Sequence, residues 1–256
     1  MEVQLTRKSF ININITNATY QNILAHIVVL AQNKISSYVC TLNVHMVIEA
    51  YKDKVFANAV NNANLITIDG MPIVKAIQWL YGTKLERVAG MDLLPDLVSE
   101  SEKHKLSIFF YGATTTVLNK INNKINLHFP NVRANFYSPP FRELSEKEEK
   151  EVVDLINKSG ANMVFVALGC PKQEKWMNKM QGKINAVMIG LGGAFPVYAE
   201  IEKRAPRWMQ KNGMEWFFRL VQDPKRLWKR YLTTNFYFVY LILKYKLIKK
   251  FETSQL

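Results

Sequence analysis

Two hydrophobic periods alternate along the chain and predict alternating strands and helices. Short, almost continuously apolar runs are typical of strands buried on both faces of a parallel sheet. Between them, apolar residues recur at three- and four-residue spacings that favour one buried helix face, as at Val44, Val47 and Ile48. The predicted strands cover residues 38–43, 64–69, 107–112, 163–169 and 186–192.

The expected helices fill the stretches between these strands. Thr16 is a candidate cap for the first helix, and Ser145 with Glu148 has the pattern of a capping box. Residues 3–13 favour a hairpin or an edge strand, and residues 130–140 a short strand and loop. Helices are predicted at residues 16–32, 44–63, 71–81, 92–104, 114–128 and 145–158, with another from residue 172. This order is typical of a Rossmann-like α/β domain, in which a parallel sheet carries helices on both faces.

The character of the sequence changes after Pro206. Residues 213–250 favour helix and are rich in basic and aromatic side chains. Residues 203–250 hold 13 Lys and Arg against 2 Asp and Glu, whereas the rest of the chain holds 21 against 19. We therefore divide the chain into an α/β domain, residues 1–203, and a basic helical appendage, residues 204–256.

The basic appendage predicts an anionic partner. Its longest apolar run, residues 236–243, has 8 residues, well short of the roughly 20 that a membrane-spanning helix needs. Basic residues around aromatic and aliphatic ones suit a helix that lies in the interface of an anionic membrane. A solvated basic face over a core-packed stripe is the alternative. Nucleic acid ranks below both, because the segment has no recognisable nucleic-acid motif.

The cysteines and the first residues bear on the compartment. Cys40 and Cys170 lie far apart and have neither disulfide-framework nor metal-ligand spacing. The first eight residues contain no apolar secretion signal. We expect a cytoplasmic protein that associates peripherally with the inner face of the membrane.

Polar side chains follow or flank several predicted strands. Because the carboxyl ends of parallel strands share one edge of a sheet, we expect these side chains to meet there. A carboxylate and a guanidinium among them indicate a site that binds a charged ligand and moves a proton. Asp69 is the candidate for that chemistry, and the alternative is that it only caps the helix after Gly70. The set comprises Thr41, Asn43, Asp69, Arg87, Gln173 and Glu174.

Three further features each allow two interpretations. Cys170 is a candidate nucleophile, but a small buried thiol is favoured because the sequence assigns it no base. The helix start after it, with Lys172, is able to hold an anion. Glycines between residues 190 and 193 resemble a dinucleotide fingerprint superficially, and close backbone approach is the favoured explanation. We interpret His45 as a structural or substrate-orienting residue, because no His/Asp cluster accompanies it.

The chain contains no Asp-x-Asp pair. Sugar transferases that steer a diphosphate through a divalent metal usually have one, so basic side chains would have to stabilise a leaving diphosphate here. Arg219 and Arg226 are seven residues apart and share a face if the segment is one helix. We expect neither a metal site nor a cofactor. The basic candidates in the appendage are Arg219, Arg226, Lys229 and Arg230.

Eight short motifs follow one another between about residues 38 and 232. They are Thr41-Leu-Asn43, Ile68-Asp69-Gly70, Arg87-Val-Ala-Gly90-Met-Asp92, Gly169-Cys-Pro171-Lys-Gln173-Glu174-Lys-Trp176, Gly192-Gly-Ala-Phe195, Arg204-Ala-Pro206-Arg-Trp208, Gly213-Met-Glu215-Trp216 and Arg219-Leu-Val-Gln-Asp-Pro224-Lys-Arg226-Leu-Trp-Lys-Arg230-Tyr231. Each motif alone is weak, but eight in order are specific. Through them the chain resembles the WecG/TagA/CpsF glycosyltransferase family (glycosyltransferase family 26).

The resemblance implies an inverting, metal-independent transfer of a sugar from a UDP donor to a lipid-linked sugar on the cytoplasmic membrane face. Typical members transfer N-acetylmannosamine or its uronic acid, and others transfer glucose. In the family pattern Asp69 is the general base, Thr41 and Gln173 line the catalytic centre, and the arginines of the appendage close over the diphosphate. The expected catalytic residues are Asp69 and Thr41. The expected substrate-binding set is Asn43, His45, Arg87, Lys172, Gln173, Arg219, Arg226 and Arg230.

Some features leave the donor sugar and the function class open. Phe195-Pro196 stands where the family usually has Phe-Asp, and Glu200 stands where it has a small glycine. Family members of this kind form oligomers, so a homo-oligomer is a further expectation. A non-catalytic, membrane-recruited module that binds a sugar nucleotide is the alternative function, and it would leave Asp69 without a task. A nicotinamide-dependent oxidoreductase is disfavoured by the missing N-terminal fingerprint.

Overall fold

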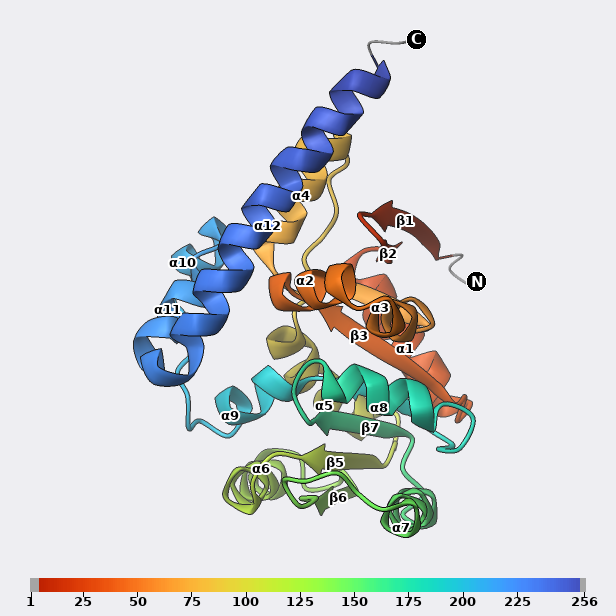
Figure 1. Ribbon diagram of the computed structural model, residues 1–256. Coiled ribbons are helices and arrows are strands. Elements are labelled where there is room, and N and C mark those ends of the chain that lie inside the picture. Colours follow the sequence, from red (N-terminus) through yellow and green to blue (C-terminus); the bar gives the residue numbers. More distant parts are fainter. Residues whose placement is uncertain (1–4, 254–256) are drawn as a thin grey trace.

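A six-stranded, fully parallel sheet forms the centre of the molecule in the computed structural model, which describes residues 5–253. The strands are β3 (Ser37–Leu42), β4 (Leu65–Ile68), β5 (Ile108–Gly112), β6 (Ala134–Tyr137), β7 (Met163–Ala167) and β8 (Val187–Gly190). Their order across the sheet is β4-β3-β8-β7-β5-β6 (Figure 1). A separate antiparallel hairpin, β1 (Thr6–Phe10) and β2 (Ile13–Asn17), precedes the sheet. The predicted parallel α/β architecture is confirmed.

Helices cover both faces of the sheet. They are α1 (Tyr20–Gln32), α2 (Val44–Lys52), α3 (Lys54–Asn61), α4 (Met71–Tyr81), α5 (Gly90–Lys103), α6 (Thr115–His128), α7 (Glu146–Lys158), α8 (Lys172–Met180), α9 (Phe195–Tyr198), α10 (Arg207–Asn212), α11 (Glu215–Gln222) and α12 (Pro224–Thr253). One hydrophobic cluster joins the sheet to α2, α3, α4, α7, α8 and α12. The other joins it to α1, α5, α6 and α9. The molecule therefore has the three layers that the apolar strands require.

Two predicted helix boundaries are wrong. Asp53 interrupts the single helix expected over residues 44–63, because its side chain accepts hydrogen bonds from the backbone of Val55 and Phe56 and starts α3 afresh. Thr16 does not cap the first helix; it lies in β2, and its hydroxyl accepts a hydrogen bond from the backbone N–H of Ile66 at 3.0 Å. The capping residue is Thr19. The capping box at Ser145, in contrast, is confirmed.

The C-terminal segment forms three helices and not one. Asp223 ends α11 and Pro224 begins α12, so the condition under which Arg219 and Arg226 would share one helix face is not met. Helix α12 runs along α2 and α4 (Figure 1), and its Phe238 is buried in the adjacent core cluster. Among the described residues, no helix is both long and apolar enough to cross a membrane.

The topology brings several strand ends to one edge. From β3 the chain passes outward to β4, and it returns to the other side of β3 only with β8. Strand connections that diverge in this way leave a crevice beyond the carboxyl ends, where α/β proteins bind ligands. The Thr41 hydroxyl joins the two strands there by donating to the carbonyl of Gly190 at 2.7 Å.

Candidate active site

Asp69 lies directly after β4, at the edge of the sheet where ligands bind. Its backbone N–H donates to the carbonyl of Leu42 at 2.9 Å and so ties it to the end of β3. The helix that follows has Gly70 as its N-cap, with no side-chain capping bond. Instead, the Asp69 carboxylate accepts a hydrogen bond from the backbone N–H of Gly90 at 3.2 Å. The alternative in which Asp69 only caps α4 is therefore wrong.

The Asp69 carboxyl group holds its proton more tightly than an ordinary aspartate. Burial is the largest cause and raises its pKa to about 6, and the negative charge of Glu215 acts in the same direction. Arg87, Arg219 and the Gly90 N–H oppose this rise. A carboxylate with a pKa just below neutral is largely ionised at pH 7 yet accepts a proton readily, which is the property that a general base needs.

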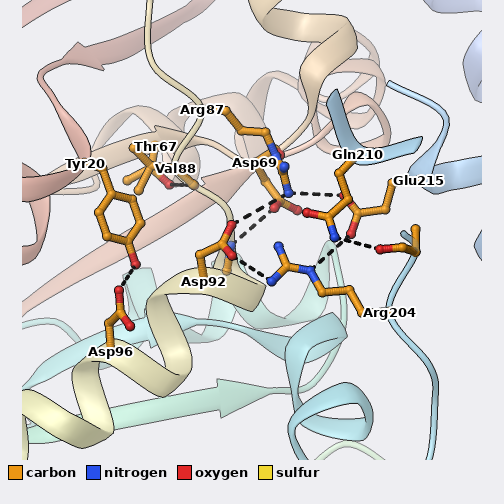
Figure 2. Close-up of polar contacts among 12 residues, drawn as sticks. Tyr20, Thr67, Asp69, Arg87, Val88, Asp92, Asp96, Arg204, Gln210 and Glu215 are labelled. Atoms are coloured by element: carbon orange, nitrogen blue, oxygen red, sulfur yellow. Dashed lines mark hydrogen bonds and ion pairs between the residues drawn. The ribbon is translucent and has the colours of Figure 1, made fainter. Parts of the chain in front are cut away.

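Four charged side chains from four segments surround Asp69 and form what we call the charge ring: Arg87, Asp92, Arg204 and Glu215 (Figure 2). Arg87 donates to the backbone carbonyl of Asp69 at 2.7 Å and forms an ion pair with Glu215 at 3.1 Å. Arg204 forms an ion pair with Asp92 at 2.6 Å. Only Arg87 was expected as a site residue from the sequence. The other three stand in the family motifs, and that is the only signal by which they could have been found.

Gln173 lies at the start of α8 with a buried side chain. Its amide oxygen accepts from the N–H of Gly192 at 3.2 Å, and its amide nitrogen donates to Glu174 at 2.7 Å. A Cβ on Gly190 would lie 2.6 Å from that nitrogen. Close approach therefore explains these glycines, as the sequence favoured, and Gln173 lies beside the strand end that Thr41 contacts.

The environment of the Cys170 thiol disfavours its ionisation. Burial raises its pKa well above the ordinary value, and the neighbouring Glu174 carboxyl group raises it further. The thiolate is the nucleophilic form, so this environment disfavours a nucleophilic role and supports the structural interpretation.

Asn43 and His45 lie at the start of α2. The Asn43 side chain caps the helix by accepting from the N–H of Met46 at 3.1 Å. Burial lowers the pKa of His45, and the positive charge of Arg230 lowers it further. His45 is therefore largely neutral at pH 7, and it lies close to one of the basic residues of the C-terminal segment.

The basic residues expected to hold a diphosphate occupy different surroundings. Arg219 donates to the carbonyl of Gly193 at 3.1 Å and lies near enough to Asp69 to lower its pKa. Arg226 is exposed and forms ion pairs with Asp223 at 2.6 Å and Glu202 at 3.4 Å. The guanidinium carbon of Arg230 lies 5.2 Å from the centre of the Tyr231 ring, in a cation–π contact.

The expected residues thus fall into three groups. Thr41, Gln173 and Arg219 bond to the turn after β8, Asp69 bonds to Gly90 and Arg87 bonds to the backbone of Asp69. These residues belong to one centre, because Arg219 lies near enough to Asp69 to lower its pKa and Gly90 approaches Thr41 closely. His45 and Arg230 form a second group next to the start of α8, since the charge of Arg230 lowers the pKa of His45 and the nearby backbone of Cys170 raises it. Lys172 is the exposed first residue of α8, and Arg226 is paired elsewhere. Within residues 5–253, no three His, Cys, Asp or Glu side chains are grouped to hold a metal ion.

Comparison with known proteins identifies the family. Residues 8–252 match the sequence profile described as "Glycosyl transferase WecG/TagA/CpsF family". A Bacillus subtilis (strain 168) protein named N-acetylglucosaminyldiphosphoundecaprenol N-acetyl-beta-D-mannosaminyltransferase is 34% identical over 219 residues, 85% of this chain and 84% of its own. A Staphylococcus aureus (strain MW2) protein of the same name is 28% identical over 210 residues, 82% and 80% of the two chains. The expected enzyme class is confirmed, and the chain belongs to the WecG/TagA/CpsF family of glycosyltransferases.

Proposed function

We propose that this enzyme transfers N-acetylmannosamine, its uronic acid or a related hexose from a UDP-sugar to a polyprenyl-diphosphate-linked sugar, with inversion at the anomeric carbon. The product would serve cell-surface polysaccharide or teichoic acid synthesis. The names of the relatives, which specify a mannosaminyl group and an N-acetylglucosaminyl-diphosphoundecaprenol acceptor, support the substrate class. The observation that carries the proposal is the Asp69 carboxylate, whose pKa is raised to about 6 at the ligand-binding edge of the sheet.

In this mechanism Asp69 removes the proton from the acceptor hydroxyl as its oxygen attacks the anomeric carbon of the donor. The bond between the anomeric carbon and the diphosphate breaks on the opposite face, and UDP leaves with the bonding electrons. One group acts as base and no covalent sugar–enzyme bond forms, so the configuration inverts. Thr41 and Gln173 line this centre, where their hydrogen bonds to Gly190 and Gly192 fix their side chains.

The leaving diphosphate gains negative charge as the bond breaks, and cationic side chains stabilise it. Arg219 is the best supported candidate, because its guanidinium donates to the carbonyl of Gly193 and lies near enough to Asp69 to lower the pKa of that carboxyl group. Arg230, Lys172 and Arg87 are further candidates. Arg226 would first have to exchange its two ion pairs for the diphosphate. Metal independence remains a prediction.

The acceptor is lipid-linked, so the enzyme must work at a membrane surface. We propose peripheral association with the inner face of the cytoplasmic membrane through the C-terminal helices. Large aromatic side chains are exposed there among basic residues, as interfacial helices require. The exposed aromatics are Trp208, Trp216, Phe217, Trp228, Phe236 and Tyr240. The two-domain division and a homo-oligomeric state also remain predictions.

The proposal is tested by measuring UDP release with a panel of UDP-sugars. The assay contains a synthetic N-acetylglucosamine-diphosphate-lipid acceptor, anionic vesicles and a metal chelator. Acceptor-dependent UDP release from one donor is the expected result, and it would identify that donor. Release that needs no acceptor, or none from folded enzyme with any donor, would contradict the proposed reaction. UDP binding without turnover would instead favour the non-catalytic sugar-nucleotide-binding module.

A further inference from the structure

The charge ring links the C-terminal segment to the catalytic edge of the sheet. Arg87 follows β4, Asp92 lies in the first turn of α5, Arg204 precedes α10, and Glu215 begins α11. The ion pairs Arg87–Glu215 and Arg204–Asp92 are short, at 3.1 and 2.6 Å. The cross pairs Arg87–Asp92 and Arg204–Glu215 are longer, both at 3.9 Å. Two positive and two negative charges therefore alternate around a closed circuit.

The Arg87–Glu215 side of the ring is the part best shielded from water. The side chains of Arg87 and Glu215 are 15% and 21% exposed, whereas Asp92 in the same ring is 40% exposed and Arg226 in its own ion pair is 64% exposed. Partial burial strengthens charge–charge attraction and makes the loss of one partner costly. One oxygen of Glu215 and two nitrogens of Arg204 are buried without a hydrogen bond. Glu215 and Arg204 thus have complementary groups that a small movement could bring together.

Glu215 and Arg219 are four residues apart on α11, so they lie on the same side of the helix. Glu215 contacts Arg87, which in turn donates to the backbone of Asp69. Arg219 contacts Gly193, which lies in the turn after β8. One short helix is therefore attached to the site at two points, at Glu215 through the ring and at Arg219 through the glycine turn.

We propose that Glu215 and Arg204 are positioning residues for the transfer reaction: through the charge ring they hold α11 against the end of β4, so that Asp69 and Arg219 face the same substrate. The inference rests on the proposed function, because it assumes that Asp69 is the base and that Arg219 binds the leaving group. The charged groups that face Asp69 are Arg87 after β4, Asp92 on α5, Arg204 before α10, and Glu215 and Arg219 on α11.

The decisive variant is Glu215→Gln, which removes one charge and keeps the size of the side chain. We expect kcat/KM to fall 10- to 100-fold, chiefly through kcat. We also expect the acidic limb of the pH profile to move to lower pH by about half a unit, because the negative charge of Glu215 favours the protonated form of Asp69. Glu215→Asp retains the charge, so its limb should stay at the wild-type position even where kcat falls. The control, Glu200→Gln, removes an equal charge from the exposed ion pair with Lys124 and should stay within twofold of wild type.

A second measurement does not depend on activity. Hydrogen exchange of the backbone amides of α11 should be faster in Glu215→Gln and Arg204→Gln than in the wild type. The double variant should be little worse than either single variant, because both remove the same ring. Unchanged exchange in α11, or a Glu215→Gln enzyme with wild-type kcat/KM and pH limb, would overturn the inference. If Glu215→Gln fails to fold, Glu215→Asp and Arg204→Gln provide the same exchange test.

Failure of this inference is distinguishable from failure of the proposed function. A fully active Asp69→Asn enzyme would show that Asp69 is not the base, whatever the hydrogen exchange in α11 shows. An inactive Asp69→Asn enzyme together with an unaffected Glu215→Gln enzyme would support Asp69 as the base and refute the positioning role of Glu215.

Discussion

Asp69→Asn should stabilise the protein while it lowers turnover by about 10²–10⁴-fold. The native environment raises the pKa of Asp69 from 3.8 to about 6, so the folded protein binds the proton more tightly than the unfolded chain does. Between these two values the native state holds more protons than the unfolded state, and the free energy of unfolding must fall as pH rises. The loss continues through pH 6, where half of the folded protein still holds the proton, and is essentially complete at pH 7. Asparagine at position 69 does not titrate, so the variant does not suffer this loss of stability.

The size of the effect follows from the shift. A rise from 3.8 to about 6 corresponds to about 3 kcal/mol as an upper bound. Asp69 keeps some contact with solvent, which screens the charge, so we expect a gain of about 1–2 kcal/mol at pH 7. In a chain of this length that gain raises Tm by several degrees, at about 2–4 °C per kcal/mol. The asparagine oxygen can still accept the hydrogen bond from Gly90, so geometry is preserved.

Urea unfolding of both proteins at pH 7 and pH 4.5 measures this effect. The variant should be more stable at pH 7, and by pH 4.5 about two-thirds of the difference should be gone, because Asp69 in the folded protein is then almost fully protonated while most of it in the unfolded chain is still ionised. The slope of unfolding free energy against urea should be the same in both proteins. Equal or lower stability of the variant at pH 7, or a difference that does not change with pH, would refute the electrostatic account of Asp69.

Three further substitutions test separate parts of the structure. Thr41→Val removes the hydrogen bond to the buried carbonyl of Gly190; urea unfolding should show a loss of about 1–3 kcal/mol, with reduced kcat. Gly193→Ala places a Cβ 2.8 Å from the Arg219 guanidinium and should lower kcat/KM at least tenfold without a large change in Tm. Ser145→Ala removes a capping box far from the site and should cost about 1 kcal/mol of stability, measured by urea unfolding, with turnover unchanged.

Each of these substitutions has its own contradicting outcome. Thr41→Ser keeps the hydroxyl, so it should recover most of the lost stability. A Thr41→Val protein as stable as wild type would show that the hydrogen bond to Gly190 does not contribute to stability. Full activity of Gly193→Ala would mean that the contact with Arg219 plays no part in the reaction. A loss of turnover in Ser145→Ala, with the fold intact, would show that the capping box matters beyond stability.

The sequence predicted the sheet well because each buried strand is an almost unbroken apolar run. It also predicted that Asp69 lies at the ligand-binding edge, since the residue follows such a run directly. Local signals were less decisive where two candidates compete. Thr16 and Thr19 are both acceptable helix caps, and only the contact of Thr16 with Ile66 in β4 assigns Thr16 to a strand. The hydrophobic spacing of residues 44–63 likewise runs through the break that Asp53 makes.

The charge ring lay beyond sequence reasoning because its two ion pairs join residues more than 100 positions apart. No periodicity reports which arginine meets which carboxylate across that distance. The break between α11 and α12 had a local signal, Asp223-Pro224, because proline disfavours helical geometry in the residue before it. That signal separates Arg226 from the helix that carries Arg219. The expectation that Arg219 and Arg226 share a helix face did not take this proline into account.

The central claim is that Asp69 is the general base, and the most direct test is kcat/KM for UDP release against pH in the wild type and in Asp69→Asn. The wild-type rate should fall on the acidic side with a midpoint near pH 6, where the Asp69 carboxylate takes up its proton. Asp69→Asn, shown to be folded by its melting curve, should lose about 10²–10⁴-fold in rate and no longer show that limb. A folded Asp69→Asn enzyme with near wild-type turnover and the same acidic limb would contradict the account.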